Sequence, residues 1–291
     1  ALTGHGVLQL PQAPRDVTRF EKIARQPIWN DEDMAVLDEG AASAVAGEAT
    51  GRGGLLMKGA FALRPAAALS TWFSDTEMRA ERVTRLERTD GCWWLIGEDD
   101  AVLGEVDSVV LAAGWGSADL LNGFDQTPRL SPVRGQADWI DGDVTVHPMA
   151  WGGYAVPTGQ GVLFGATHDR GDTDTAPRED DSARNLATLE ARLPALAKRI
   201  AAAGPVQHRA AVRATTPDRL PVAGALDDGL YVLGGLGSRG FCVAPLLGEH
   251  IAALVLGQPS PLPGDLSARV SARRSAVLTD ALASSSPTRA G

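Results

Sequence analysis

Three glycines near the C-terminal end of the chain have a spacing that could hold a flat or anionic ligand. Gly235, Gly237 and Gly240 follow the apolar run 230–233 in the pattern Gly-x-Gly-x-x-Gly. Glycine has no Cβ, so backbone N–H groups of such a turn can approach a ligand closely. A dinucleotide fingerprint normally opens a β-α-β unit, with an acidic ribose ligand about 20 residues further on. Only about 50 residues follow Gly240, with no further predicted strand, so this turn is expected near the end of a fold.

An arginine close to this turn could bind a carboxylate. Arg213 ends an apolar strand candidate and precedes Thr-Thr-Pro-Asp at 215–218. Its planar guanidinium could present two parallel donors to a carboxylate. The alternative is a surface arginine paired with Asp218, and the residues alone favour that alternative. Two other motifs, the apolar run 108–114 with its glycine exit and the turn at 131–136, also fit ordinary packing.

Composition and charge limit the class of protein. The chain has 291 residues, 44% of them hydrophobic and 22% charged, which is ordinary for a globular protein. A net charge of −9 argues against nucleic-acid binding over the whole surface but allows a local basic rim. No apolar run is long enough to cross a bilayer. Cys92 and Cys242 lack metal spacing and are expected to be reduced core thiols of a cytoplasmic protein. A start at Ala1 without Met suggests a fragment or a processed product.

The hydrophobic pattern alternates between strands and helices, which is typical of an α/β protein. Strands are predicted at 6–10, 83–87, 92–96, 101–102, 108–114, 135–140, 144–147, 153–157, 162–167, 207–214 and 230–233. Helices are predicted at 17–25, 31–46 with Asp31 as N-cap, 66–73 after Pro65, 180–203 with a break or kink at Pro194, and 244–256. The strands at 83–102 should form a hairpin meander, and 108–114 a fully buried parallel strand.

Taken in order, these motifs resemble the FAD-dependent amine oxidases of the D-amino-acid-oxidase type, which include glycine and sarcosine oxidases. The resemblance covers about residues 6–258. It rests on these segments: 83–84, 109–114, Pro-Val-Arg-Gly-Gln at 132–136, Tyr-Ala-Val-Pro at 154–157, Gly-Ala-Thr at 165–167, the Arg213 segment and the Gly235 segment. Residues 6–10, 165–170 and 236–247 are most similar to a branch of this family that modifies tRNA.

The resemblance implies a mixed α/β (α+β) fold with two interleaved domains. One is a Rossmann-like FAD-binding domain, incomplete at its N-terminus, and the other a substrate domain with a large mixed, mostly antiparallel sheet. The substrate domain would comprise 1–63 and 132–224. The FAD-binding domain would comprise 64–131 with the meander and 225–258 with the last strand, turn and helix, and 259–291 would form a peripheral tail.

The same resemblance implies roles for individual residues. Arg213 would bind the substrate carboxylate, Tyr154 would line the same pocket, and Arg239 would be a second partner of the carboxylate or the flavin. The cofactor would lie against Val83, Ala113, Gly114, Gly235, Gly237, Ser238, Arg239, Gly240 and Phe241. No metal site is expected. Among other candidates, Trp151 is considered for stacking on a base, whereas His147 fits a structural role better than that of a catalytic base.

The function implied is an FAD-dependent oxidase that removes the carboxymethyl group of 5-carboxymethylaminomethyl-(2-thio)uridine at the tRNA wobble position. Its substrate partner would be tRNA or a small amino-acid-like amine. A fused or separate methyltransferase module would be a further partner, and no membrane association is expected. A free glycine, sarcosine or D-amino-acid-type oxidase and a non-catalytic fragment remain as alternatives. No Gly-x-Gly-x-x-Gly precedes Gly51, so the isolated chain is expected to hold FAD poorly.

Overall fold

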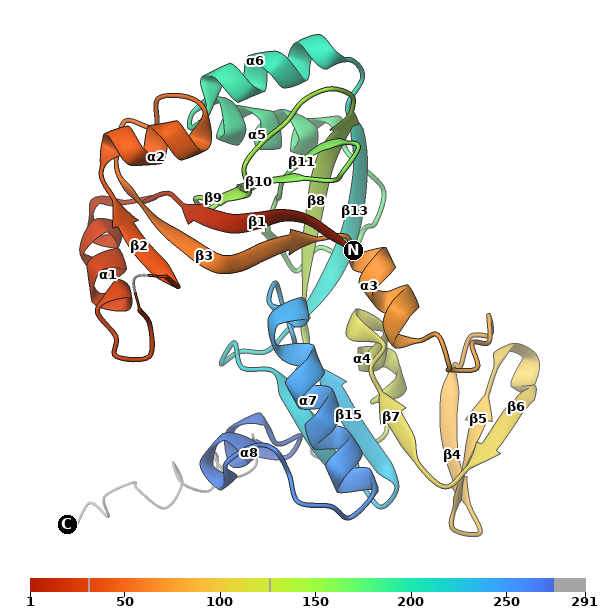
Figure 1. Cartoon of the computed structure of the whole chain (residues 1–291). Helices are drawn as coiled ribbons and strands as arrows, with labels where there is room; N and C mark the ends of the chain where they lie inside the picture. The colour runs from red at the N-terminus through yellow and green to blue at the C-terminus, as the bar shows by residue number, and fades with distance from the viewer. Residues whose placement is uncertain (31, 126, 275–291) are drawn as a thin grey trace, which may run out of the picture. The chain divides into compact units, whose positions relative to one another are not determined.

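A computed structural model describes residues 1–30, 32–125 and 127–274 of the chain (Figure 1). The chain forms two compact units that interleave along the sequence. Unit 1 comprises residues 1–77, 135–168 and 175–211, and unit 2 comprises residues 78–134, 169–174 and the chain from 212 onward. Each unit has its own hydrophobic core.

Nine strands form one mixed sheet, and most of its residues belong to unit 1. Its order is β12-β8-β11-β10-β9-β1-β3-β2, with β13 also beside β8. The strands are β1 (Leu2–Gln9), β2 (Met34–Leu37), β3 (Gly54–Leu63), β8 (Ser131–Asp141), β9 (Met149–Ala150), β10 (Tyr154–Pro157), β11 (Gly161–Gly165), β12 (Asp169–Arg170) and β13 (Gln207–Thr215). The neighbours β1 and β9 run parallel, whereas β10 and β11 are antiparallel to their neighbours.

Three helices share one core with this sheet in unit 1. They are α2 (Glu39–Ala46), α5 (Glu179–Glu190) and α6 (Pro194–Ala203), and Figure 1 shows them on the same side of the sheet. Leu189 and Leu196 of these helices pack in one cluster with Leu8 and Phe164 of the strands. Pro194 is the first residue of α6, which confirms the predicted break, because proline is tolerated where the first helical N–H has no partner. Two more helices, α1 (Pro14–Ala24) and α3 (Pro65–Trp72), also belong to this unit.

Unit 2 contains two small sheets that share a second core. In the first, β7 (Val109–Leu111) is parallel to β15 (Leu230–Gly234), which is antiparallel to β14 (Val222–Asp227). The second is the predicted meander of β4 (Arg85–Thr89), β5 (Cys92–Ile96) and β6 (Val102–Val106). Trp93 joins the two, because its ring is in the shared core and its Nε1 donates to the Asp228 carbonyl at 3.0 Å. The helices of this unit are α4 (Ser117–Leu120), α7 (Gly240–Val255) and α8 (Gly264–Val270), with the 3-10 turns η1 (Glu98–Asp100) and η2 (Gly114–Gly116).

The helix predicted over 31–46 is wrong in its first half. Met34–Leu37 is an edge strand, β2, paired with β3, so ladder hydrogen bonds override the helical propensity of this segment. The helix begins only after Asp38, whose Oδ1 accepts from the Ala41 N–H at 2.8 Å. Asp31, the predicted N-cap, lies outside the described residues.

Three further expectations differ from the structure. The strand predicted at 144–147 is a turn, since the Val144 N–H bonds back to the Gly142 carbonyl and pairing begins at β9. The run 108–114 is parallel to β15 as predicted but not fully buried. In the described part of the chain β7 is an end strand of three residues, and Val110 is 42% exposed. Helix α7 begins at Gly240 instead of 244.

The segment after 259 also contains packed residues. Leu262, Ala272 and Arg274 are buried, which differs from the expectation of a peripheral tail over the described part of that segment. Residues 275–291 lie outside the described residues. Both cysteines are free thiols, but Cys242 is exposed and is therefore not a core residue.

Candidate functional site

The predicted cofactor residues of unit 2 come together at one edge of its parallel strand pair. Leu230 is opposite Val109 and Val232 is opposite Leu111, so the carboxyl ends of β15 and β7 lie side by side. Ala113 and Gly114 follow β7, and the turn 235–239 follows β15. In open α/β sheets, ligands bind outside the carboxyl ends of the strands.

The glycines at this edge have backbone conformations that favour glycine. Gly114, Gly235 and Gly237 have φ values of +60°, +62° and +56°. A Cβ at Gly235 would lie 2.8 Å from the Thr216 Cγ2 atom, whereas a Cβ at Gly114 would meet no atom within 4 Å. The first position therefore needs glycine for packing, and the second leaves the backbone open to a ligand.

The turn leads directly into the longest helix of unit 2. Arg239 is the N-cap residue of α7 and makes no side-chain cap hydrogen bond. The N-terminus of a 16-residue helix carries partial positive charge and favours an anionic group. Ser238, Gly240 and the 41% exposed Phe241 complete this part of the edge. Val83 packs against the core that the two sheets of unit 2 share.

Arg213 is next to the turn and has an unused buried donor. The Ala214 carbonyl accepts from the Gly237 N–H at 3.0 Å, which ties β13 to the glycine turn. The Arg213 Nη1 is buried and has no hydrogen-bond partner among the described residues. A buried guanidinium nitrogen without an acceptor is costly, so the position is suited to a carboxylate supplied by a ligand.

The alternative pairing of Arg213 with Asp218 is wrong, because another arginine occupies that carboxylate. Arg274 donates to both Asp218 oxygens, at 2.8 and 3.0 Å, and also to the Leu220 and Pro221 carbonyls. The bidentate contact with Arg274 lowers the pKa of Asp218 from 3.8 to about 2. Sequence reasoning missed Arg274, since nothing near residue 274 indicated a buried arginine.

The same loop contacts a predicted site residue. Thr216 Oγ1 donates to the Leu220 carbonyl at 2.7 Å, and the Leu220 N–H donates to Asp218 at 3.0 Å. The Arg219 carbonyl then accepts from the Arg239 Nη2 at 3.2 Å. Arg274 thus holds a loop that contacts Arg239.

The third predicted catalytic residue, Tyr154, belongs to unit 1. It is the first residue of β10 and pairs with Gly165. The next residue, Ala155, is fully buried in the core shared with α5 and α6. Successive side chains of a strand point to opposite faces, so Tyr154 is on the sheet face opposite to these helices.

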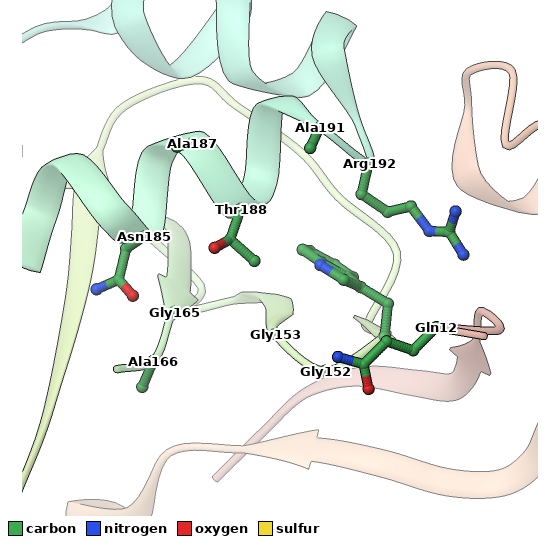
Figure 2. A pocket seen from close by; sticks show the side chains of 11 residues that line it. Gln12, Gly152, Gly153, Gly165, Ala166, Asn185, Ala187, Thr188, Ala191 and Arg192 are labelled. Carbon is green, nitrogen blue, oxygen red and sulfur yellow. The ribbon is translucent and has the colours of Figure 1, made fainter. Parts of the chain in front are cut away.

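Unit 1 also contains a cavity of about 620 Å³ between α5, the β9–β10 turn and the segment before α1 (Figure 2). Its lining residues are Gln12, Trp151, Gly152, Gly153, Gly165, Ala166, Asn185, Ala187, Thr188, Ala191 and Arg192. Trp151 is only 6% exposed and its Nε1 is a buried donor without a partner among the described residues. Trp151 packs in the core of unit 1 and also lines this cavity, so its stacking on a base stays a prediction.

His147 is half-buried in the same unit. Burial lowers the pKa of its imidazole, and its Nε2 is buried without a partner in the described part of the chain. No group of three or more His, Cys, Asp or Glu side chains among the described residues could hold a metal ion. None of the helices described is long and apolar enough to span a membrane.

Comparison with known proteins decides the family. The family model FAD dependent oxidoreductase (DAO) matches residues 2–254. The chain belongs to this family. Both the predicted resemblance and the predicted fold class are confirmed. The glycine edge and the N-terminus of α7 fit FAD, which combines a flat ring system with an anionic pyrophosphate.

Relatives within the DAO family share much of the sequence. The tRNA 5-methylaminomethyl-2-thiouridine biosynthesis bifunctional protein MnmC of Caulobacter sp. (strain K31) is 49% identical over 274 residues, which are 93% of this chain and 44% of that protein. The protein of the same name from Maricaulis maris (strain MCS10) is 38% identical over 86% of this chain and 38% of its own length. The chain therefore spans less than half the length of these relatives.

Solved structures of this family have the same fold. Glycine oxidase from Geobacillus kaustophilus superposes with a TM-score of 0.79 at 22% identity and covers 94% of this chain and 75% of its own. Iminodiacetate oxidase (IdaA) from Chelativorans sp. BNC1 has a TM-score of 0.73 at 22% identity, over 94% and 76% of the two chains.

Proposed function

We propose that this DAO-family chain oxidises the secondary amine of a carboxymethylaminomethyl group on the wobble uridine of tRNA. The observation that carries the proposal is the buried, unpartnered Nη1 of Arg213 next to the glycine turn. A carboxylate is the group that such a guanidinium binds best. The tRNA-modifying relatives, at up to 49% identity, support tRNA as the molecule that carries this carboxylate.

The proposed reaction balances as follows. The substituent R–CH2–NH–CH2–COO⁻ loses a hydride and a proton, and the resulting imine takes up water to give R–CH2–NH2 and glyoxylate. FAD, when bound, supplies the two-electron acceptor for the hydride that leaves the carbon beside the carboxylate. The chain's own contribution is mostly positioning: Arg213 fixes the carboxylate and thereby the carbon to be oxidised.

Other residues have supporting roles in this proposal. Gly114 would leave backbone open to the cofactor, and the N-terminus of α7 would favour negative charge on a flavin bound beside it. Arg239, held by the Arg219 carbonyl at 3.2 Å, is a second cation for the carboxylate or the flavin. Tyr154 would line the substrate pocket. A reaction on tRNA would place the protein in the cytoplasm, with a fused or separate methyltransferase module completing the modification.

Substitution of Arg213 tests the proposal. In FAD-saturated protein, Arg213→Ala should raise KM for an N-substituted glycine by about 10- to 150-fold, since a charge-assisted contact contributes about 1.5–3 kcal/mol. FAD affinity should change little. Arg209→Ala, on the exposed part of the same strand, is the matched control. Equal loss of FAD binding and substrate binding in Arg213→Ala would contradict the assignment.

A further inference from the structure

The cavity of unit 1 is a second place that could bind a ligand, and it is separate from the face that presents Tyr154. A Cβ at Gly153 would lie 3.3 Å from both Thr188 Cγ2 and Trp151 Nε1, so Gly153 faces α5 and the cavity. Tyr154, the next residue along β10, points to the opposite face of the sheet. The cavity therefore needs an explanation other than the proposed carboxylate site.

One end of the cavity carries a cation without an acidic partner. The Arg192 guanidinium donates from Nη2 to the Pro11 carbonyl. Burial, together with the like charge of Arg52, lowers the pKa of Arg192. A partly buried cation that has a second cation nearby attracts an anion from solution.

Two acidic side chains on adjacent segments accept hydrogen bonds from backbone amides. Glu48 accepts from the Ala195 and Leu196 N–H groups at the start of α6, at 2.8 and 2.9 Å. Asp16 accepts from the Gln12 and Ala13 N–H groups, at 2.9 and 2.8 Å. The Ala13 N–H is the main cause of the lowered pKa of Asp16, and the charges of two more cations, Arg19 and Arg15, lower it further. This rim is thus locally basic on a chain whose net charge is −9.

The remaining walls offer hydrogen-bonding groups of both kinds. Figure 2 shows Gln12, Thr188 and Asn185 around the cavity, with the backbone of the 152–153 turn at its floor. The Trp151 Nε1 adds a donor that no described residue satisfies. A volume of about 620 Å³ accommodates a molecule of nucleotide size.

We propose that this cavity binds one nucleotide unit of the substrate tRNA outside the reacting uridine, with its phosphate held by Arg192, which lines the cavity. The inference rests on the proposed function, because that function makes RNA the polyanion that meets this basic rim. Phosphate contacts position an RNA without reading its sequence. The cavity would therefore hold the tRNA while the modified base reaches the carboxylate site.

Neutral substitutions at the rim test this inference. Arg192→Gln and Arg52→Gln should each weaken tRNA binding about fivefold to tenfold in fluorescence anisotropy, and each should reduce the slope of log affinity against log salt by about 1. Arg209→Gln, an exposed arginine of unit 1 that does not line the cavity, is the matched control. Arg52 is exposed in a loop, so its variant remains informative if Arg192→Gln does not fold.

The outcomes separate this inference from the proposed function. Wild-type affinity and salt slope in both variants would overturn the cavity as an RNA site, even if the holoenzyme still oxidised modified tRNA. Free UMP could instead stabilise the wild-type protein against unfolding while tRNA binding stays unchanged in both variants. That result would assign the cavity to a small nucleotide and would also overturn the proposal that it binds tRNA. The two rim variants could lose tRNA affinity while the wild-type holoenzyme releases no glyoxylate from modified tRNA. That result would support the cavity as an RNA site and refute the proposed function.

Discussion

The contact between Arg274 and Asp218 should be the main electrostatic support of the loop beside the glycine turn. The Arg274 side chain is 9% exposed and that of Asp218 34%. A fall in the pKa of Asp218 from 3.8 to about 2 corresponds to about 2.4 kcal/mol, at about 1.36 kcal/mol for each pKa unit. Since a third of the carboxylate is in water, solvent screening reduces this value to about 1–2 kcal/mol.

A double-mutant cycle of Asp218→Asn and Arg274→Gln measures this value directly. Urea unfolding at pH 7 should give a coupling energy of about 1–2 kcal/mol, with Asp218→Asn alone destabilising by a similar amount. A carboxyl group with a lowered pKa stabilises the folded state above its unfolded pKa. The difference in unfolding free energy between wild type and Asp218→Asn should therefore persist at pH 5 and shrink as pH falls from about 4 through about 2.

A coupling energy near zero at pH 7 would refute the reasoning. So would a difference between wild type and Asp218→Asn that grows on acidification. Arg273→Gln is a suitable control, because the side chain of the neighbouring Arg273 donates from Nε and Nη2 to the Leu226 carbonyl. It should show no coupling with Asp218→Asn.

Three further predictions concern packing and titration. Gly235→Ala should lower the unfolding free energy by about 1–3 kcal/mol, because φ is +62° and the new Cβ would meet Thr216 at 2.8 Å. The same variant should bind FAD more weakly in a titration. Wild-type stability of the variant would contradict this prediction. Trp93→Phe should cost about 1–2 kcal/mol in urea unfolding, since it removes the donor to the Asp228 carbonyl; an unchanged midpoint would contradict it. Burial lowers the pKa of His147, so the folded protein binds this proton less readily than the unfolded chain does. The unfolding free energy should therefore fall as pH drops below 6.5, and His147→Asn should reduce that fall. An identical pH profile in the variant would count against this role of His147.

The sequence predicts most strands and helices of this fold because their patterns are local. The meander at 83–106 is marked by Asp-Gly and Asp-Asp turns, and the break at Pro194 follows from the chemistry of proline. The edge strand Met34–Leu37 could not be foreseen, since its stability comes from β3, which lies about 20 residues further on.

The candidate site shows the same division. The glycine spacing and Arg213 are visible in the sequence. Whether Arg213 pairs with Asp218 at the surface or faces a carboxylate site depends on Arg274, which is 61 positions away (274 − 213) and binds Asp218 instead. The cavity beside α5 could not be predicted either, because its lining residues Gln12 and Arg192 are 180 residues apart in the sequence (192 − 12). Sequence periodicity reports which residues are buried but not which distant ones meet.

The central claim is that this DAO-family chain oxidises a carboxymethylated amine on tRNA. The most direct test mixes FAD-saturated protein anaerobically with tRNA that carries 5-carboxymethylaminomethyluridine and follows flavin absorbance at about 450 nm. The account predicts loss of that absorbance, one glyoxylate released for each flavin reduced, and an aminomethyl group left on the uridine. Full retention of the absorbance with this tRNA, while free glycine or sarcosine bleaches it, would contradict the claim.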